Sequence, residues 1–219
     1  LVIVNNNSTD NTLDYLKSDY LKSDLQGATL DFLTLRENKG YGGGANAGIQ
    51  YLLDNVEGDI DFVICNNDMI LLEGVFDKLI EAAYSKDNIG IVGGKLLFPD
   101  STIQHAGSFL NDFGWGQHFG GGIPEAAYVK EEKIEEMEYC TGALLYLRQD
   151  MLNEVGFFDE QFERGYFEEV DLSFRAREYG WKTVYTPFAR AIHFENITSK
   201  SIVGDAEAVK KQISDKNQI

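Results

Sequence analysis

Two acidic motifs about a hundred residues apart hold the residue types that can do chemistry in this chain. The first is Asn66-Asn67-Asp68, which directly follows an apolar run at residues 62–65, and the second is Glu168-Glu169-Val170-Asp171. Carboxylate oxygens bind hard divalent cations such as Mg²⁺ and Mn²⁺, and a positioned carboxylate also removes protons from reacting groups. The two motifs therefore predict a metal site and a general base.

Asp68 is the candidate metal ligand. In a parallel sheet the carboxyl end of a strand opens onto the ligand crevice, so an acid that follows a strand at residues 62–65 stands where ligands bind. The neutral imidazole of His193 would complete the coordination of a cation held by Asp68. The alternative is that Asn66 and Asp68 form only a turn and a cap, and that His193 is a core or surface residue without a ligand.

Glu168 and Glu169 open a helix predicted at residues 168–179. The positive end of a helix dipole favours a charged carboxylate, which suits a general base, although acids are common in first turns without a catalytic role. Asp171 lies four residues before Arg175, so an intrahelical ion pair is its plainer interpretation.

Composition limits the class of protein. The chain has 219 residues, 43% of them hydrophobic, which is enough to bury a core as one domain or as a tightly joined pair. Its 36 acidic and 19 basic residues give a net charge of −17, which would repel a nucleic-acid backbone. Cys65 and Cys140 are expected to be buried free thiols in a reducing compartment. No apolar run reaches the roughly 20 residues that span a bilayer, and no leader resembles a signal peptide, so we expect a soluble chain, with both ends cut from a longer protein.

The order of predicted elements indicates an α/β fold. Strands and helices alternate in the first half, which favours a mainly parallel sheet with helices on both faces, and the second half reads as mixed or antiparallel sheet. The strands are expected at residues 1–4, 29–35, 61–65, 91–98, 104–110, 138–147, 183–185 and 189–193, and the helices at residues 12–21, 45–53, 73–84 and 168–179.

The glycine-rich segment at residues 40–44 is predicted to be a loop before a helix. Gly40, Gly42 and Ala45 satisfy the pattern G-x-G-x-x-A, but four residues separate the first glycine from the preceding strand, which argues against a dinucleotide fingerprint. Backbone amides at such an entrance can still approach a diphosphate, and a flexible loop without a ligand is the equal alternative.

Seven ordered motifs resemble those of family 2 glycosyltransferases, most closely the rhamnosyltransferase-like branch, from Val2 to about His193. The motifs are Asn5-Asn6-Asn7-Ser8-Thr9-Asp10-Asn11-Thr12, Asn38-Lys39-Gly40-Tyr41-Gly42-Gly43-Gly44-Ala45-Asn46, Asn66-Asn67-Asp68, Gly90-Ile91-Val92-Gly93-Gly94-Lys95-Leu96, Thr141-Gly142-Ala143, Gly156-Phe157-Phe158-Asp159-Glu160 and Tyr166-Phe167-Glu168-Glu169-Val170-Asp171-Leu172.

The resemblance implies a GT-A fold in a single domain fragment, residues 1–219, with a nucleotide-binding half at 1–98 and an acceptor-binding and catalytic half at 99–200. It implies inverting transfer of a sugar from a UDP or dTDP donor, rhamnose by analogy, to a hydroxyl of a glycan in polysaccharide biosynthesis. A divalent metal, Mn²⁺ or Mg²⁺, would assist. The acceptor would be a glycan or a lipid-linked glycan, and the location cytoplasmic, with peripheral association at the inner face of a membrane left open.

The resemblance also assigns roles by position. Glu169 would be the catalytic base, with Glu168 its neighbour and Asp171 in the same motif, and Asp68, Asn66 and His193 would hold the metal. Thr141, Gly142 and Asp159 would contact the acceptor, although Asp159 fits a turn equally well. The positions expected to bind the nucleotide are Asn5, Asn7, Asp10, Asn38, Gly40, Gly42, Asn46 and Asn67.

Some features depart from the usual pattern of the family. Asn5 and Asn66 stand where acids are usual, and Glu169 replaces the commoner Asp, which sets the base one methylene further out. The first strand-helix unit of the fold is expected to be missing from this chain. Two other function classes stay open, a sugar-phosphate nucleotidyltransferase, which would need a basic glycine-rich first loop, and a non-catalytic carbohydrate-binding remnant.

Overall fold

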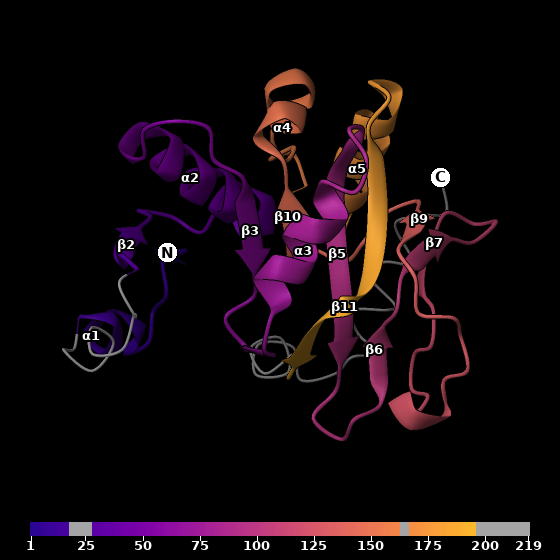
Figure 1. Ribbon diagram of the computed structural model, residues 1–219. Helices are drawn as coiled ribbons and strands as arrows, with labels where there is room; N and C mark the ends of the chain where they lie inside the picture. The colour runs from indigo at the N-terminus through magenta and orange to yellow at the C-terminus, as the bar shows by residue number, and fades with distance from the viewer. Residues whose placement is uncertain (18–27, 163–166, 196–219) are drawn as a thin grey trace.

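The computed structural model describes residues 1–17, 28–162 and 167–195 (Figure 1). Of the helix predicted at residues 12–21, α1 (Thr12–Leu16) is present and the part from residue 18 lies outside the described residues. Tyr166, which belongs to the motif before Glu168, also lies outside them. None of the helices in the described ranges is both long enough and apolar enough to cross a membrane.

The first two strands form a small parallel sheet of their own. β1 (Val2–Asn5) pairs with β2 (Asp31–Thr34) in the register that sets Val2 against Asp31 and Asn5 against Thr34. Helix α2 (Gly40–Asn55) packs against β1, because Gly48 lets the helix approach the side chain of Val4. Both strands were predicted. The missing strand-helix unit stays a prediction.

The prediction of a loop at residues 40–44 is wrong, because these residues are the first turn of α2. A Cβ atom at Gly42 would lie 3.2 Å from Cβ of Phe158, and one at Gly44 would lie 3.2 Å from Nδ2 of Asn6. Glycine is unfavourable within a helix by about 1 kcal/mol relative to alanine. Here it allows the start of the helix to pack closely against two other segments, which local sequence patterns do not reveal.

A seven-stranded mixed sheet forms the centre of the molecule. Its main path runs β3, β10, β5, β11, β4, with β6 on β5 and β9 on β11. The bounds are β3 Phe62–Cys65, β4 Met69–Leu71, β5 Ile89–Leu97, β6 Ile103–His105, β9 Glu135–Met137, β10 Leu144–Leu147 and β11 Lys182–His193. The mixed sheet was predicted. It is not mainly parallel, however: among the described strands of this sheet only β5 and β11 pair in parallel, and β10 inserts antiparallel between β3 and β5.

Helices cover both faces of this sheet, as predicted (Figure 1). On one face α3 (Val75–Ala83) buries Val75, Leu79 and Ala82 against β5, β10 and β11. On the other face lie α2, α4 (Gln149–Val155) and α5 (Glu168–Glu178), whose buried side chains join a second cluster. These two apolar clusters hold the sheet between the helices, and the candidate site residues lie at one edge of this sheet.

The second half of the chain differs from the prediction in its strand boundaries. The strand expected at 104–110 splits into β6 and β7 (Ser108–Leu110), because Gly107 between them has a φ of +92°. The glycine-rich stretch contains β8 (Gly116–His118), which pairs with β7. The strand expected at 138–147 is only β10, and the two strands expected at 183–193 are the single strand β11. β4, α4 and a short 3-10 helix at Glu125–Ala127 were not predicted.

Candidate active site

The three residues expected to hold a metal lie together. Asp68 occupies the turn between β3 and β4, and the pairing of β4 with β11 sets Met69 opposite His193. Oδ1 of Asp68 lies 3.1 Å from Nε2 of His193, and the side-chain amide of Asn66 lies 3.4 Å from the same nitrogen. The backbone N–H of Phe194 donates to the carbonyl of Asp68 at 3.0 Å, which holds the turn against the end of β11.

His193 is oriented by a residue that the sequence did not single out. Its side chain is buried, with 6% of the residue exposed, and Nδ1 lies 2.6 Å from Oε1 of Gln104 in β6. Gln104 Nε2 donates to Oε2 of Glu195 at 3.2 Å. Sequence reasoning missed Gln104 because its only signal is a strand pairing between distant segments.

The donor set at this point fits a divalent cation. A carboxylate oxygen, an imidazole nitrogen and an amide oxygen are ligands that Mn²⁺ and Mg²⁺ accept. Asn66 would have to turn its amide to offer the oxygen, because its Nδ2 is the atom that faces His193 here. Two donors placed at right angles about 2.1 Å from one cation lie about 3 Å apart, close to the 3.1 Å between Asp68 Oδ1 and His193 Nε2. In the described part of the chain no group of three or more His, Cys, Asp or Glu side chains gathers as a metal cage. Water and substrate oxygens would have to supply the other ligands.

Glu168 and Glu169 stand in the first turn of α5, as predicted. The residue before them, Phe167, has a left-handed backbone with a φ of +80°, a strained conformation that occurs more often at functional sites. Glu168 is fully buried beside Gly42, and neither carboxylate oxygen has a hydrogen-bond partner among the described residues. Burial raises the pKa of Glu168, against the opposing effect of nearby backbone N–H groups.

Glu169 has the electrostatics of a base poised near neutral pH. Burial raises the pKa of Glu169 to about 7, and the negative charge of Glu168 adds to the rise. The backbone N–H groups of Glu169 itself and of Gly142 act in the opposite direction. A catalytic carboxylate works best when its pKa lies near the operating pH, so this environment suits proton removal.

Tyr41 connects the two acidic motifs. Its hydroxyl donates to the carbonyl of Gly142 at 2.5 Å. Burial, followed by the charges of Glu169, Glu168 and the Cys65 thiolate, raises the pKa of Tyr41 well above its usual value, so these groups all lie within electrostatic range of its ring. Sequence reasoning did not assign Tyr41 a role.

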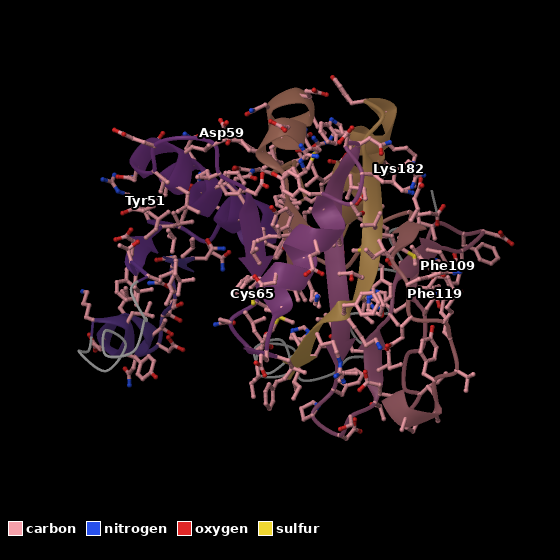
Figure 2. The ribbon with its side chains drawn as sticks, in the orientation of Figure 1. Tyr51, Asp59, Cys65, Phe109, Phe119 and Lys182 are labelled. Atoms are coloured by element: carbon pink, nitrogen blue, oxygen red, sulfur yellow. The ribbon has the colours of Figure 1, made fainter. Side chains whose placement is uncertain are left out.

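Cys65 extends this link to the metal residues. It lies at the end of β3 (Figure 2) and is exposed, contrary to the prediction that both thiols are buried, because β3 ends where the sheet opens. Cys140 is buried, and both cysteines are free, as predicted. Although part of Cys65 is exposed, the protein atoms around its thiol desolvate it, and this effect, followed by the charge of Asp68, raises the pKa of Cys65 to about 11. The backbone N–H of Asn66 donates to the carbonyl of Ala143 at 2.9 Å, next to the Gly142 that Tyr41 contacts, so the two motifs meet in one neighbourhood.

The residues expected to bind the nucleotide lie where β1 ends and α2 begins. Asn5 is buried, its Oδ1 accepts from the N–H of Ser8, and its Nδ2 has no partner in the described segments. Asn38 Oδ1 accepts from the N–H of Gly40. Asn6, which sequence reasoning left out, accepts from the N–H of Lys39 and donates to the carbonyl of Gly40, so it fastens the two elements together.

Asn7, Asp10 and Asn67 are exposed. Asn7 has a φ of +62°, so its backbone occupies the left-handed region that asparagine tolerates better than most residues. Asp10 accepts from both the N–H and the hydroxyl of Thr12, and these two hydrogen bonds lower the pKa of Asp10.

The residues expected near the acceptor have local partners. Thr141 Oγ1 lies 3.5 Å from the backbone N–H of Ala143, and Gly142 lies against Tyr41. Asp159 accepts from both the backbone and the side chain of Gln161, which is the turn geometry left open from the sequence. Asp171 forms the predicted ion pair with Arg175, with Oδ2 2.7 Å from Nε.

Asn46 joins α2 to the segment before α5. Its Nδ2 donates to the carbonyl of Phe158 at 2.8 Å, and its Oδ1 accepts from the N–H of Phe158 at 3.0 Å. The amide that was expected to contact the nucleotide is therefore engaged by the protein in this structure.

We expect Asn46→Ala to lower the free energy of unfolding by about 1–3 kcal/mol, because it leaves both backbone groups of the buried Phe158 without partners. Urea unfolding measures the change. Asn55→Ala is the control, because among the described residues the amide of Asn55 bonds only Tyr51, on the exposed part of the same helix. An equal loss in the two variants would show that Asn46 does not clamp α2 to Phe158.

The chain is similar to proteins of one known family. The family model described as Glycosyl transferase family 2 matches residues 1–153. The O-antigen biosynthesis protein RfbC of Myxococcus xanthus is 31% identical over 141 residues, which cover 62% of this chain and 11% of that protein. The N-acetylglucosaminyl-diphospho-decaprenol L-rhamnosyltransferase of Mycobacterium tuberculosis is 28% identical over 210 residues, which cover 88% of this chain and 66% of that protein. The chain thus spans only part of the length of these relatives.

Two solved structures share the fold at low sequence identity. GalNAc-T7 with UDP, GalNAc and Mn²⁺ superposes with a TM-score of 0.67 at 14% identity, over 88% of this chain and 37% of the other. The mannosyltransferase PcManGT from Pyrobaculum calidifontis, in complex with GDP-Man and Mn²⁺, gives a TM-score of 0.59 at 12% identity, over 90% of this chain and 48% of the other. Motifs, family model and fold agree, and we conclude that the chain has the GT-A fold and belongs to glycosyl transferase family 2.

Proposed function

We propose that this protein is an inverting glycosyltransferase that moves a sugar from a nucleoside-diphosphate donor to a hydroxyl group of a glycan. The observation that carries the proposal is the convergence of Asp68 and His193, which suit a cation, with Glu169, which suits a base, in the neighbourhood of Tyr41. The residues come from α2, α5, β11 and the turn between β3 and β4, which are far apart in sequence. A turn or a helix cap alone would not require all of them together.

Asp68, His193 and the amide of Asn66 would hold Mn²⁺ or Mg²⁺. When bound, the cation would offset the negative charge that develops on the departing nucleoside diphosphate. Asn66 carries no charge, so Asp68 is the only carboxylate among the three proposed ligands. Both structural neighbours are described with Mn²⁺, which supports the choice of metal.

Glu169 would take the proton of the attacking hydroxyl. The N–H of Gly142 opposes the rise in the pKa of Glu169 and so favours its charged form, and Tyr41 holds Gly142 in place through the carbonyl of that residue. The chemistry needs one displacement at the anomeric carbon and no covalent nucleophile, so the product would have the inverted configuration. The negative charge of Glu168 would help to keep the pKa of Glu169 near neutral pH.

The first half of the chain would bind the nucleotide, and residues 99–200 the acceptor. Asn5, Asn7 and Asp10 would contact the base and ribose, while Asn38, Gly40, Gly42 and Asn67 would lie near the ribose and diphosphate. Thr141, Gly142 and Asp159 would face the acceptor. The start of α2 suits a diphosphate because the first backbone N–H groups of a helix have no partner within it.

The names of the two bacterial relatives suggest which donor and which acceptor to test first. One is called an L-rhamnosyltransferase acting on a diphospho-decaprenol glycan, and the other an O-antigen biosynthesis protein. We extend the proposal to a dTDP or UDP sugar, with rhamnose as the first donor to test. A lipid-linked glycan is the acceptor that these names favour, and peripheral contact with the cytoplasmic face of a membrane would follow from it.

Titration calorimetry with UDP and with dTDP, each with and without MnCl₂, tests the proposal. We expect one nucleotide to bind, and to bind more tightly with Mn²⁺ present. Absence of nucleotide binding under every condition would contradict an enzyme of this class and favour a carbohydrate-binding remnant. Formation of a nucleotide sugar from a nucleoside triphosphate and a sugar phosphate would identify the nucleotidyltransferase instead.

Activity should depend on pH in the direction set by Glu169. Because the pKa of Glu169 is about 7, the base form is lost as the pH falls, so kcat/KM should fall about tenfold per pH unit below 7 and level off above it. A pH profile of kcat/KM measures this. The residual rate of Glu169→Gln should lack the same inflection, and an inflection retained in that variant would assign it to another group.

A further inference from the structure

We propose that Gln104 is a positioning residue for the metal site: it fixes which nitrogen of His193 faces Asp68. This inference rests on the proposed function, because it concerns the same cation. Gln104 lies in β6 and His193 at the end of β11, and both strands pair with the same strand, β5. The side chains therefore meet across the sheet although they are 89 residues apart in sequence.

The orientation of the Gln104 amide follows from its other partner. Glu195 is a carboxylate that, when charged, can only accept hydrogen bonds, and it lies 3.2 Å from Nε2 of Gln104. The NH₂ group of Gln104 thus points to Glu195, and its carbonyl oxygen points to His193. That oxygen cannot donate, so the 2.6 Å contact requires that Nδ1 of His193 carries the hydrogen.

This tautomer decides which group Nε2 of His193 presents to Asp68. In the neutral imidazole with a hydrogen on Nδ1, Nε2 presents its lone pair, and this nitrogen is the one 3.1 Å from Oδ1 of Asp68. Two acceptors at this distance repel each other, and the donor that the described residues place nearest to Nε2 is the amide nitrogen of Asn66 at 3.4 Å. A divalent cation between Asp68 and His193 would bind both acceptors and remove the repulsion. A hydrogen bond from the non-coordinating nitrogen to a polar group is the usual way in which proteins orient a metal-bound histidine.

The burial of His193 also suits such a role for Gln104, which is itself half-buried. His193 is almost fully buried, so its ring cannot turn to solvent for an alternative partner. The backbone carbonyl of Gln104 lies 3.3 Å from Nδ1 of His118, which ties the same residue to β8. Removing the side-chain amide of Gln104 would leave the backbone contact with His118 in place. His193 therefore reports on the side chain of Gln104, and His118 on its backbone.

Three variants test the inference. Gln104→Leu removes the acceptor with little change in volume. The double variant Gln104→Glu with Glu195→Gln restores an acceptor toward His193 and a donor toward the new carboxylate. Gln117→Leu is the control, because Gln117 lies on the neighbouring β8, is exposed, and its side chain bonds only the carbonyl of Gly116 in the described part of the chain. Thermal unfolding of each variant checks that it is folded.

The first readout is the dissociation constant of Mn²⁺, measured by electron paramagnetic resonance with saturating UDP or dTDP. Loss of an outer partner of a metal-bound histidine weakens binding by about 10- to 100-fold, and we expect this for Gln104→Leu, with recovery in the double variant. The second readout needs no metal: ¹⁵N NMR of labelled histidine should show the hydrogen of His193 on Nδ1 in the wild type and a mixture of tautomers in Gln104→Leu. The chain has only three histidines, and His118 should be unchanged.

Equal Mn²⁺ affinity and an unchanged His193 tautomer in Gln104→Leu would overturn the inference and leave the proposed function intact. Failure of the wild-type protein itself to bind Mn²⁺ with either nucleotide would overturn the metal part of the proposed function, and the inference with it. If Gln104→Leu weakened Mn²⁺ binding and the double variant did not restore it, the positioning role would also be contradicted. The loss would then come from altered side-chain packing and not from the missing hydrogen bond.

Discussion

Glu169→Gln is expected to lower kcat by about 10²- to 10⁴-fold, the usual contribution of a general base. Glutamine has nearly the same shape as glutamate and cannot accept the proton of the acceptor hydroxyl. Because Glu169 would act on the acceptor and not on the donor, the affinity for nucleotide and Mn²⁺ should change little. Steady-state kinetics with the donor identified by titration, together with calorimetry, separate the two effects.

Two variants on the same helix serve as controls for Glu169. Glu178→Gln changes an exposed acid in the last turn of α5 and should leave kcat unchanged. Asp171→Asn weakens the ion pair with Arg175, which should cost less than about 1 kcal/mol of stability. Unchanged turnover in Glu169→Gln, together with lost turnover in Asp171→Asn, would show that Asp171 and not Glu169 is the base.

Asp68→Asn is the second substitution with a large expected effect. It removes the only carboxylate among the proposed metal ligands, so both Mn²⁺ affinity and turnover should fall. A cation acting as a Lewis acid contributes several kcal/mol to catalysis, so we expect a loss of about a hundredfold or more in kcat/KM. Unlike Glu169→Gln, this variant should also lose the Mn²⁺-dependent part of nucleotide binding.

Asp54→Asn is the matched control for Asp68, because Asp54 is an exposed acid on α2 that bonds only Gln50 among the described residues. It should behave as the wild type in both assays. If Asp68→Asn bound Mn²⁺ and nucleotide as tightly as the wild type, the cation would have to be held elsewhere or not be needed.

The elements with clear local patterns could be predicted from the sequence. β1, β3 and α5 appear within one or two residues of their expected bounds, because an apolar run or an amphipathic helix depends mostly on its own side chains. The ion pair of Asp171 with Arg175 could be predicted for the same reason, since helix geometry alone brings positions four apart together.

The features that depend on distant contacts could not be predicted. The sequence predicted a loop at residues 40–44 because glycine is unfavourable in helices. The helix forms there because close packing against Phe158 offsets that cost in free energy. The parallel pairing of β5 with β11 and the insertion of β10 are decided by the whole sheet. A local pattern carries no information about which strands become neighbours.

The same limit applies to the candidate site. Asp68 and His193 could be selected by residue type and by motif, and the structure brings them together. Gln104 and Tyr41 could not be, because what distinguishes them is contact with segments far away in sequence, such as His193 for Gln104 and Gly142 for Tyr41. Asn46 lies in a motif that predicted nucleotide binding, but in the structure its amide bonds the backbone of Phe158, 112 residues away.

Diffraction at the manganese edge, from crystals grown with MnCl₂ and the nucleotide that binds more tightly, tests the central claim most directly. We predict one anomalous peak between the carboxylate of Asp68 and the imidazole of His193, with the nucleotide diphosphate beside it and Glu169 facing the same space. A bound nucleotide without manganese at Asp68 and His193, or with Glu169 turned away from it, would contradict the account.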